Sequence, residues 1–268
     1  MNKRWLITGT GSGLGRALAE AALKRGDRVA AIQRGGDDIP GAITWRLDVR
    51  DSAALEQAVR EAEVELAGID VLVPNAGYGL VGGVEEASDA EWRDQFDVNF
   101  FSVMTLLRAA LPGMRARRSG RILVISSVSG LVGWPSLGPY SASKFALEGA
   151  VETLALETAP LGIEVTLIEP GGLRTGFSTR SRRPSARTIS DYDATVGQSR
   201  RLLAEHAGTE AGDPVKAADA ILAMADHPDP PLRLLLGEDA LLYAEGKLNQ
   251  QREEIERWRE LTLAIGYQ

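Results

Sequence analysis

Short apolar runs alternate with stretches of helical pattern along most of the chain, and this alternation is the strongest constraint on its fold. A strand, a helix and a second strand in succession form a βαβ unit, whose two strands run parallel. The order therefore predicts one α/β domain over residues 1–268, a doubly wound parallel sheet of about seven strands. The expected strands are 4–7, 28–33, 44–47, 71–74, 121–126, 164–169 and 232–236, and the expected helices are 13–25, 52–66, 91–117, 141–159, 214–225 and 239–265.

Four details qualify this outline. Ser52 is expected to cap the second helix, and Pro112 to interrupt or end the third. Residues 172–213 are rich in Gly, Ser, Thr and Arg, with only a weak helical pattern near 190–206. Because long loops in compact domains are usually functional lids or mobile segments, we expect a substrate lid there. A charged amphipathic helix over 239–265 is expected to form a C-terminal extension.

A glycine-rich turn follows the first expected strand and opens the first expected helix. Its sequence runs from Thr8 through Gly9, Gly13 and Leu14 to Gly15. Glycines let a main chain approach a pyrophosphate closely, and a helix N-terminus offers free N–H groups and positive potential. The turn therefore predicts a dinucleotide site in a Rossmann-like fold, the alternative being a glycine-rich turn without a ligand.

Tyr140 and Lys144 stand four residues apart on an expected helix, and Ser127 precedes Tyr140 by thirteen residues. Side chains four apart share a helix face, with Cβ atoms roughly 5–6 Å apart. An ammonium there favours the phenolate, which lowers the tyrosine pKa from about 10 toward neutrality. Such a tyrosine exchanges a proton with a carbonyl oxygen. Taken singly, Tyr140 is more often a half-buried aromatic and Lys144 a surface residue.

Charge and residue usage exclude several classes of protein. The 268 residues carry a formal net charge of −7, which does not favour nucleic acid or an anionic membrane as a partner. The chain has no cysteine and two isolated histidines, so no metal site is expected. Neither a signal peptide nor a membrane-spanning run is recognisable, and we expect a cytoplasmic protein.

These motifs resemble those of the short-chain dehydrogenase/reductase family in order and context from residue 8 to residue 175. The glycines match its T-G-x-x-x-G-x-G turn, and Tyr140 and Lys144 match its Y-x-x-x-K. Pro74 departs from the family's N-N-A-G, where we expect only a local adjustment. The resemblance implies catalytic roles for Asn99, Ser127, Tyr140 and Lys144. It implies cofactor contacts by Thr8, Gly9, Gly13, Leu14, Gly15, Asp48, Val49, Asn75, Ala76, Gly77, Tyr140, Lys144, Pro170, Gly171 and Thr175.

Some of these residues have simpler explanations. Asp48 can cap a turn, and Asn75 and Asn99 can bond their own backbone at a turn or a helix bend. In the family-like interpretation, Ser127 donates to the substrate oxygen, Tyr140 exchanges its proton, and Asn99 positions water in a relay toward Lys144.

The second expected strand ends in Gln33 and Arg34, where an NAD-specific site would place an acidic residue. Arginine suits a 2′-phosphate because it is always charged and binds bidentately. We therefore expect NADP(H) to be favoured over NAD(H). Ser12, which is not basic, and the nearby Asp37 and Asp38 weigh against this preference, and Arg34 can also be a solvated side chain.

The substrate is less constrained. Trp134 lies with Leu131, Val132 and Leu137 between Ser127 and Tyr140, where the family lines its substrate pocket; core packing of Trp134 is the alternative. A hydrophobic wall suits steroid-like, retinoid-like, acyl or aromatic carbonyls. The positive charge of the lid's arginines could attract an anionic substrate or contact the cofactor phosphates; the alternative is that these side chains are solvated on a mobile loop. The arginines are Arg174, Arg180, Arg182, Arg183, Arg187, Arg200 and Arg201.

By resemblance, helices 91–117 and 141–159 pair across a two-fold axis in a homodimer, with a homotetramer as the alternative. The C-terminal helix is expected to cover an edge that tetrameric relatives use. The leading function is a carbonyl reductase or alcohol dehydrogenase acting on a small molecule. An NAD(H)-preferring alcohol dehydrogenase, an epimerase or dehydratase of an extended version of the fold, and a non-catalytic nucleotide sensor are the alternatives.

Overall fold

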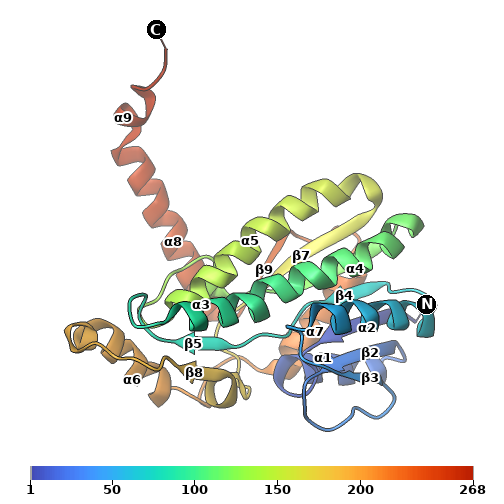
Figure 1. Cartoon of the computed structure of the whole chain (residues 1–268). Helices are drawn as coiled ribbons and strands as arrows, with labels where there is room; N and C mark the ends of the chain where they lie inside the picture. Colours follow the sequence, from blue (N-terminus) through green and yellow to red (C-terminus); the bar gives the residue numbers. More distant parts are fainter. Residues whose placement is uncertain (1, 268) are drawn as a thin grey trace.

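The computed structural model describes residues 2–267. Seven parallel strands form one sheet in the order β3-β2-β1-β4-β6-β7-β9, which confirms the doubly wound α/β fold (Figure 1). Chain reversal between β1 and β4 places the topological switch point in the middle of the sheet, where such folds bind ligands. The strands are β1 (Arg4–Thr8), β2 (Arg28–Gln33), β3 (Ile43–Arg46), β4 (Val71–Val73), β6 (Gly120–Ile125), β7 (Ile163–Pro170) and β9 (Arg233–Leu236).

Helices cover both faces of the sheet and bury an apolar core on each. Along β1, Leu6 points to one core while Trp5 and Ile7 point to the other, as the two-residue period of a strand requires. Helices α1 (Gly13–Lys24) and α7 (Pro214–Asp226) pack on the Trp5 face. The Leu6 face is covered by α2 (Ser52–Glu65), α4 (Ser102–Arg117) and α5 (Gly138–Thr158).

The third expected helix differs from its prediction. It consists of α3 (Asp89–Phe96), a π-helical turn η1 (Asp97–Phe101) and α4 in continuous succession. Pro112 lies inside α4 and does not end it. The cap of α2 also differs, because the Asp51 carboxylate, rather than Ser52, accepts the bond from the Ala54 N–H.

Two short strands were not predicted. β5 (Gly79–Val81) and β8 (Arg182–Pro184) pair in parallel outside the main sheet. Because β8 belongs to the expected lid, this ladder fastens the lid to the segment that follows β4. The rest of the lid is short turns and one helix: η4 (Phe177–Ser181), η5 (Ser190–Tyr192), η6 (Asp193–Gly197) and α6 (Gln198–Glu205). Two further turns are η2 (Val128–Gly130) and η3 (Ala159–Leu161).

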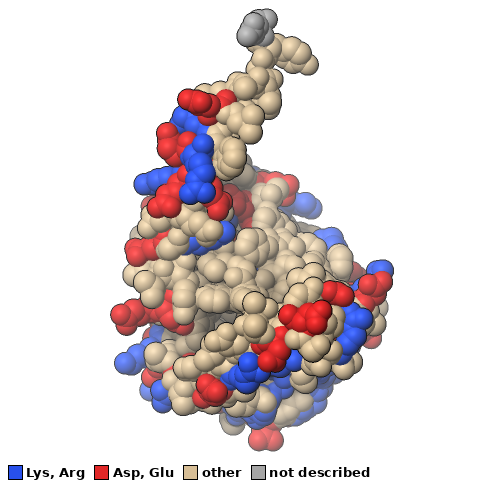
Figure 2. All heavy atoms as spheres, turned by 90° about the vertical axis from the view of Figure 1, so that its left-hand side faces the viewer, with Lys and Arg blue, Asp and Glu red and all other residues tan. Residues whose placement is uncertain are grey.

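The C-terminal helix projects from the body (Figure 1), and its expected covering of an edge that tetrameric relatives use stays a prediction. It is also broken at Trp258 into α8 (Glu238–Arg257) and α9 (Arg259–Leu263). Ala240 and Ala244 are the buried residues of α8, and α9 has none. Figure 2 shows charged side chains along one side of this projection and a wide uncharged area on the body below it. Among the helices of residues 2–267, none has the length and hydropathy to span a membrane.

Candidate active site

A cavity of about 1020 Å³ lies at the carboxyl ends of the parallel strands. It extends from the ends of β2 and β3, past the glycine turn, to α5 and the lid. Most of the residues predicted from the sequence line this one space, although they are spread over more than half of the chain. These are Gly9, Gly13, Leu14, Arg34, Asp48, Val49, Asn75, Ala76, Gly77, Ser127, Trp134, Tyr140, Lys144, Pro170, Gly171 and Thr175.

The glycine turn leaves no room for side chains. A Cβ on Gly15 would lie 2.6 Å from the Gly9 carbonyl oxygen and would overlap the Asn75 amide. A Cβ on Gly11 would overlap the carbonyl oxygen of Gly35. Gly11 was not singled out from the sequence, although the Gly35-Gly36 pair opposite it was a signal of close backbone approach. The turn therefore exposes main-chain N–H groups at the start of α1, as a bound pyrophosphate requires.

Thr8 and Asn75 stand behind the turn and fix its shape. The Thr8 hydroxyl accepts hydrogen bonds from the N–H groups of Asn75 and Ala76, each at 3.0 Å. In return, the Asn75 amide donates to the Thr8 carbonyl at 2.8 Å. Pro74 requires only a local adjustment, since its carbonyl still accepts from the Ile125 N–H at 3.0 Å. The two strand ends β1 and β4 are thus held together at the cavity floor.

The far end of the cavity contains Gln33, Arg34 and Asp48. Gln33 is 2% exposed, and its side chain bonds Thr10 and the Gly36 carbonyl. The Arg34 side chain is 64% exposed, with its guanidinium 3.8 Å from the Asp48 carboxylate. Hydrogen bonds from Arg50, despite partial burial, lower the pKa of Asp48 to about 2. Asp48 is therefore an ionised carboxylate that both closes a turn with Arg50 and faces the cavity.

Asn99 lies in the π turn η1, 1% exposed. Its amide accepts from the Tyr78 N–H at 3.1 Å and donates to the Tyr78 carbonyl at 3.0 Å and to Ser143 Oγ at 3.2 Å. These bonds attach the segment after β4 to α5, where Tyr140 and Lys144 are found. Its predicted part in a water relay stays a prediction.

Ser127 and Tyr140 lie together in the cavity wall, 9% and 8% exposed. Burial raises the pKa of Tyr140, and the Ser127 hydroxyl and the charge of Arg182 only partly oppose that shift. This direction is opposite to the lowered pKa expected from the Tyr-x-x-x-Lys spacing. The protein's own groups therefore keep Tyr140 as a neutral phenol, which is the form that donates a proton to a carbonyl oxygen.

Lys144 is buried one helical turn after Tyr140. Its ammonium donates to the Ile125 carbonyl at 2.8 Å, which holds it at the end of β6. Burial lowers the pKa of Lys144 to about 8, and the negative charge of Glu148 acts in the opposite direction. Glu148 is itself buried and is bound by Arg233 at 3.2 Å. Lys144 thus titrates close to physiological pH.

Apolar side chains form the cavity wall around Tyr140. Trp134 and Leu137 line it, as expected, whereas Leu131 and Val132 do not. The Trp134 ring meets Tyr243 of α8 edge-on, with ring centroids 4.5 Å apart. Phe177 of the lid lies with its ring centroid 5.8 Å from that of Tyr140. Phe177 and Tyr243 were not predicted, because single aromatics in a loop and on a charged helix give no sequence signal.

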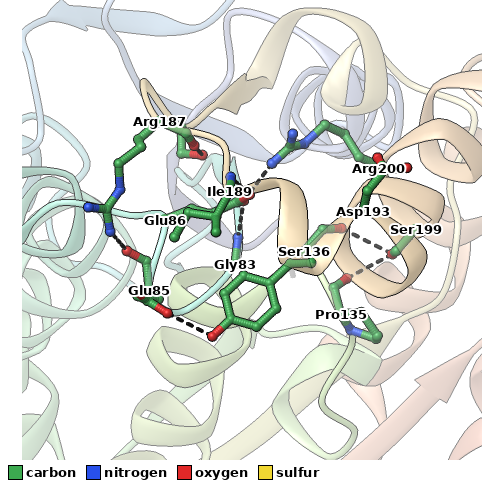
Figure 3. A network of polar contacts seen from close by, with 12 residues as sticks. Gly83, Glu85, Glu86, Pro135, Ser136, Arg187, Ile189, Asp193, Ser199 and Arg200 are labelled. Atoms are coloured by element: carbon green, nitrogen blue, oxygen red, sulfur yellow. Dashed lines mark hydrogen bonds and ion pairs between the residues drawn. The ribbon is translucent and has the colours of Figure 1, made fainter.

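The lid is attached to the body by a buried carboxylate, shown in Figure 3. Glu86, which is 2% exposed, accepts from the N–H groups of Gly83 and Ile189, each at 2.9 Å, and pairs with Arg200 at 2.6 Å. Burial alone would raise the pKa of Glu86, but these bonds and the Arg200 charge lower it overall. Ser199 adds a bond to the Pro135 carbonyl at 2.8 Å (Figure 3).

Across residues 2–267, no group of three or more His, Asp or Glu side chains is arranged to hold a metal ion. Tyr140, Lys144 and Ser127 line the same cavity as the glycine turn. The absence of a Cβ at Gly9, Gly11 and Gly15 lets the turn pack closely against Asn75, Ala76 and Gly35.

Comparison with known proteins agrees with the family resemblance of the sequence motifs. Residues 3–186 match a family model described as short chain dehydrogenase. An oxidoreductase of Botryotinia fuckeliana is 37% identical over 98% of this chain and 99% of its own length. A 3-ketodihydrosphingosine reductase of Bacteroides thetaiotaomicron is 38% identical over 90% of this chain and 91% of its own length.

Two solved structures are similar over nearly the whole chain. A short-chain dehydrogenase from Streptomyces avermitilis superposes with a TM-score of 0.92 at 38% identity, covering 100% of this chain and 99% of that one. A short-chain dehydrogenase/reductase from Burkholderia phymatum, in complex with NAD, gives a TM-score of 0.79 at 25% identity and covers 95% of each chain.

Proposed function

The chain belongs to the short-chain dehydrogenase family of NAD(P)-dependent oxidoreductases, and we propose that it transfers hydride between NADP(H) and a carbonyl or secondary alcohol. The observation that carries this proposal is the shared cavity. The glycine turn lines its middle part, and one of its ends is formed by Ser127, Tyr140 and Lys144. Both parts of a dehydrogenase site, cofactor cradle and proton donor, therefore open into one space.

The residues along the cavity suit a dinucleotide in a definite order. The N-terminus of α1 and the turn from Gly9 to Leu14 would hold the pyrophosphate. Asp48 and Val49 would contact the adenine end, and Lys144 with the segment from Pro170 to Thr175 the nicotinamide end. When bound, the cofactor supplies or accepts the hydride; proton handling falls to the protein.

In the reductive direction, Tyr140 donates its phenolic proton to the carbonyl oxygen. Ser127 donates a hydrogen bond to the same oxygen and stabilises the negative charge that develops on it. The Lys144 ammonium stabilises the phenolate that Tyr140 becomes. Because burial raises the pKa of Tyr140, the phenol that donates this proton is its form at neutral pH. In oxidation the same groups act in reverse, with Tyr140 as the base.

The preference for NADP(H) is supported by the far end of the cavity. Gln33 provides no carboxylate to repel a 2′-phosphate, and the exposed Arg34 guanidinium is available to bind one. Its contact with Asp48 is long, at 3.8 Å, and is exposed to solvent. A 2′-phosphate therefore competes for the Arg34 guanidinium only with its weak ion pair to Asp48.

The apolar wall supports a hydrophobic carbonyl substrate. Trp134, Leu137 and Phe177 surround Tyr140 with ring and aliphatic surface. The relative from Bacteroides thetaiotaomicron is named as a reductase of 3-ketodihydrosphingosine. A ketone with a sizeable apolar part is therefore the substrate class that we favour for this chain.

A homodimer is the expected assembly, formed through α4 and α5. Phe101 just before α4 and Phe145 on α5 are 53% and 45% exposed, and a row of aromatic rings continues from Phe101 to Trp92. Exposed aromatic residues of this kind are typical of subunit interfaces. Light scattering at micromolar concentration tests this expectation, and a monomer would contradict it.

The test of the function is a turnover screen with NADPH and NADH against ketones, aldehydes and secondary alcohols, followed by titration of both cofactors at moderate salt. We expect turnover of a hydrophobic ketone and tighter binding of NADPH. Arg34→Ala should weaken NADPH binding and leave NADH binding nearly unchanged. Equal or tighter NADH binding by the unmodified protein would refute the cofactor preference. Tight cofactor binding without turnover across the panel would favour the nucleotide-sensor alternative.

A further inference from the structure

The arginines of the lid (residues 172–213) divide into two groups. Four of them do not line the cavity and bond other protein groups, two of them main-chain carbonyls and two of them carboxylates. Three line the cavity, and none of these has an Asp or Glu of residues 2–267 within 4.0 Å: Arg180, Arg182 and Arg183. The four outside the cavity wall are Arg174 (carbonyl of Glu210), Arg187 (carbonyl of Glu85), Arg200 (carboxylate of Glu86) and Arg201 (carboxylate of Asp193).

Arg182 lies deepest of the three. It sits on β8 opposite Gly79, is partly buried, and stacks over the Phe177 ring with its guanidinium carbon 5.9 Å from the ring centroid. One N–H donates to the Leu203 carbonyl at a long 3.4 Å. Arg183, beside it, is exposed and stacks over Tyr78. The guanidinium of Arg182 is therefore positioned by packing, while most of its five N–H donors have no protein acceptor.

The position of Arg182 is electrostatically coupled to the catalytic phenol. Burial lowers the pKa of Arg182, while Tyr140 and Glu210 raise it, and its charge in turn lowers the pKa of Tyr140. An arginine remains charged under these conditions. Glu210 acts on Arg182 only through space, with no carboxylate oxygen within 4.0 Å of the guanidinium. A partly buried cation without a contacting anion destabilises a folded protein unless another group supplies that contact. In a cavity wall, that group is most simply part of a ligand.

We propose that Arg182 binds a carboxylate or phosphate carried by the substrate whose carbonyl reacts at Tyr140. This inference rests on the proposed oxidoreductase function and narrows its substrate to a carbonyl compound with both an apolar body and an acidic group. The apolar part lies against Val81, Leu137 and Phe177, which pack around Tyr140. A guanidinium matches both anions because its paired N–H groups bond two oxygens at once.

The pyrophosphate of the dinucleotide is the other source of the same chemistry. Its cradle at the start of α1 lies against Thr175, since a Cβ on Gly13 would meet the Thr175 side chain at 3.4 Å. Arg182 instead belongs to the group of side chains around Tyr140 and Phe177. The substrate is therefore the source that we favour, and cofactor binding is measured separately.

The experiment compares a series of straight-chain oxo acids, with the keto group at successive positions, with their methyl esters. In the unmodified enzyme, at least one acid should have a higher kcat/KM than its ester. Arg182→Met should lower the ratio of kcat/KM for that acid to kcat/KM for its ester about 10- to 100-fold, the range for hydrogen bonds to a charged group, because the effect of the lost charge on Tyr140 is common to both substrates. Arg182→Lys should recover part of the loss. Arg201→Met, which removes an exposed ion pair of the lid, is the matched control and should retain the preference for the acid.

Three outcomes would overturn the inference. The first is an equal loss for acid and ester in Arg182→Met. The second is weaker NADPH binding in Arg182→Met with an unchanged acid-to-ester ratio, which would assign the charge to the cofactor. If the unmodified protein turns over no carbonyl compound, the proposed function fails. The inference is then decided by the melting temperature of the protein with each acid and with its ester. The third contrary outcome is a rise in melting temperature that acid and ester cause equally, or a rise with the acid that persists in Arg182→Met.

Discussion

At the scale of single residues, the environment of Tyr140 differs most from the sequence expectation. The spacing of Tyr140 and Lys144 places both on one face of α5, as predicted. It does not set the sign of the tyrosine's pKa shift, because that depends on burial by residues far away in the sequence, Phe177 of the lid among them. Residue type and spacing identify the candidate proton donor, and tertiary burial decides its protonation state.

Replacing Tyr140 by Phe tests this donor directly. The ring and its packing against Phe177 are retained, and only the hydroxyl is lost. Turnover should fall at least about 10²-fold, the low end for a general acid–base group. Cofactor affinity, measured by quenching of tryptophan fluorescence, should remain. Turnover near that of the unmodified enzyme would remove Tyr140 from the mechanism.

The pKa of Lys144 predicts a pH dependence. Its folded-state pKa is lowered to about 8, so the ammonium is present below that pH and lost above it. Tyr140 remains protonated over this window because its pKa is raised. The rate of carbonyl reduction should therefore fall as pH rises through about 8, which a kcat/KM profile measures.

Glu148→Gln provides the control for that profile. The carboxylate of Glu148 raises the pKa of Lys144, so its neutralisation should move the fall in rate to lower pH. The same burial also affects stability. Because the lysine binds its proton less tightly in the folded state, its charge opposes folding below about pH 8, and this penalty declines as pH rises toward the unfolded value. A fall in rate with the same midpoint in Glu148→Gln would show that Lys144 is not the titrating group.

At the scale of secondary-structure elements, the regular part of the fold was predictable. Each main strand lies within a residue or two of its expected position, because buried parallel strands are short apolar runs between turns. β5 and β8 were not predicted, since three residues give no periodic signal. The π turn at Asp97–Phe101 was missed for a related reason: a single widened turn of five residues inside a long helix is too short for its shifted apolar pattern to be recognised.

The attachment of the lid through Glu86 leads to a prediction about this element. In Glu86→Gln, the side chain keeps its shape and one acceptor but loses the charge that binds Arg200. The lid should open more often and expose Arg187, Arg200 and Arg201 to trypsin, so cleavage within the lid should be faster. The effect should be large at neutral pH, where Glu86 of the unmodified chain is ionised. The lowered pKa of Glu86 means that its stabilising charge is present at neutral pH and lost on acidification.

A matched variant separates the buried pair from exposed ones. Arg201→Gln removes the ion pair with Asp193. The side chains of this pair are 58% and 67% exposed, and exposed ion pairs contribute little to the stability of a fold. Its cleavage rate at the remaining arginines should match that of the unmodified chain. If Glu86→Gln and Arg201→Gln are cleaved equally fast, Glu86 does not hold the lid.

At the scale of the whole molecule, the chain consists of a sheet-centred body and a projecting C-terminal helix. The described residues beyond Ala244 include no buried side chain. Removal of residues 247–268 should therefore change the melting temperature by less than about 2 °C and leave turnover intact, because surface positions contribute little stability. Thermal unfolding and the turnover assay measure both.

A longer deletion is the contrasting case. Removing everything from Glu238 onward also removes Asp239, which accepts the Gly172 N–H at 2.7 Å, and Tyr243, which packs against Trp134. Both contacts lie at the cavity, so this variant should lose activity as well as stability. If the two deletions have the same activity and the same melting temperature, the first turns of α8 do not differ in function from its outer part.

The projecting helix joins two places that are otherwise far apart. Its first turns carry Asp239 and Tyr243 at the mouth of the cavity, and a helix of 20 residues extends about 30 Å. Its outer part presents Leu248, Ile255 and Trp258 to solvent. A helix moves as a stiff rod, so a force applied to its free end is felt at Trp134. A partner that binds the outer part of α8 therefore also shifts Tyr243, which packs against Trp134 in the cavity wall.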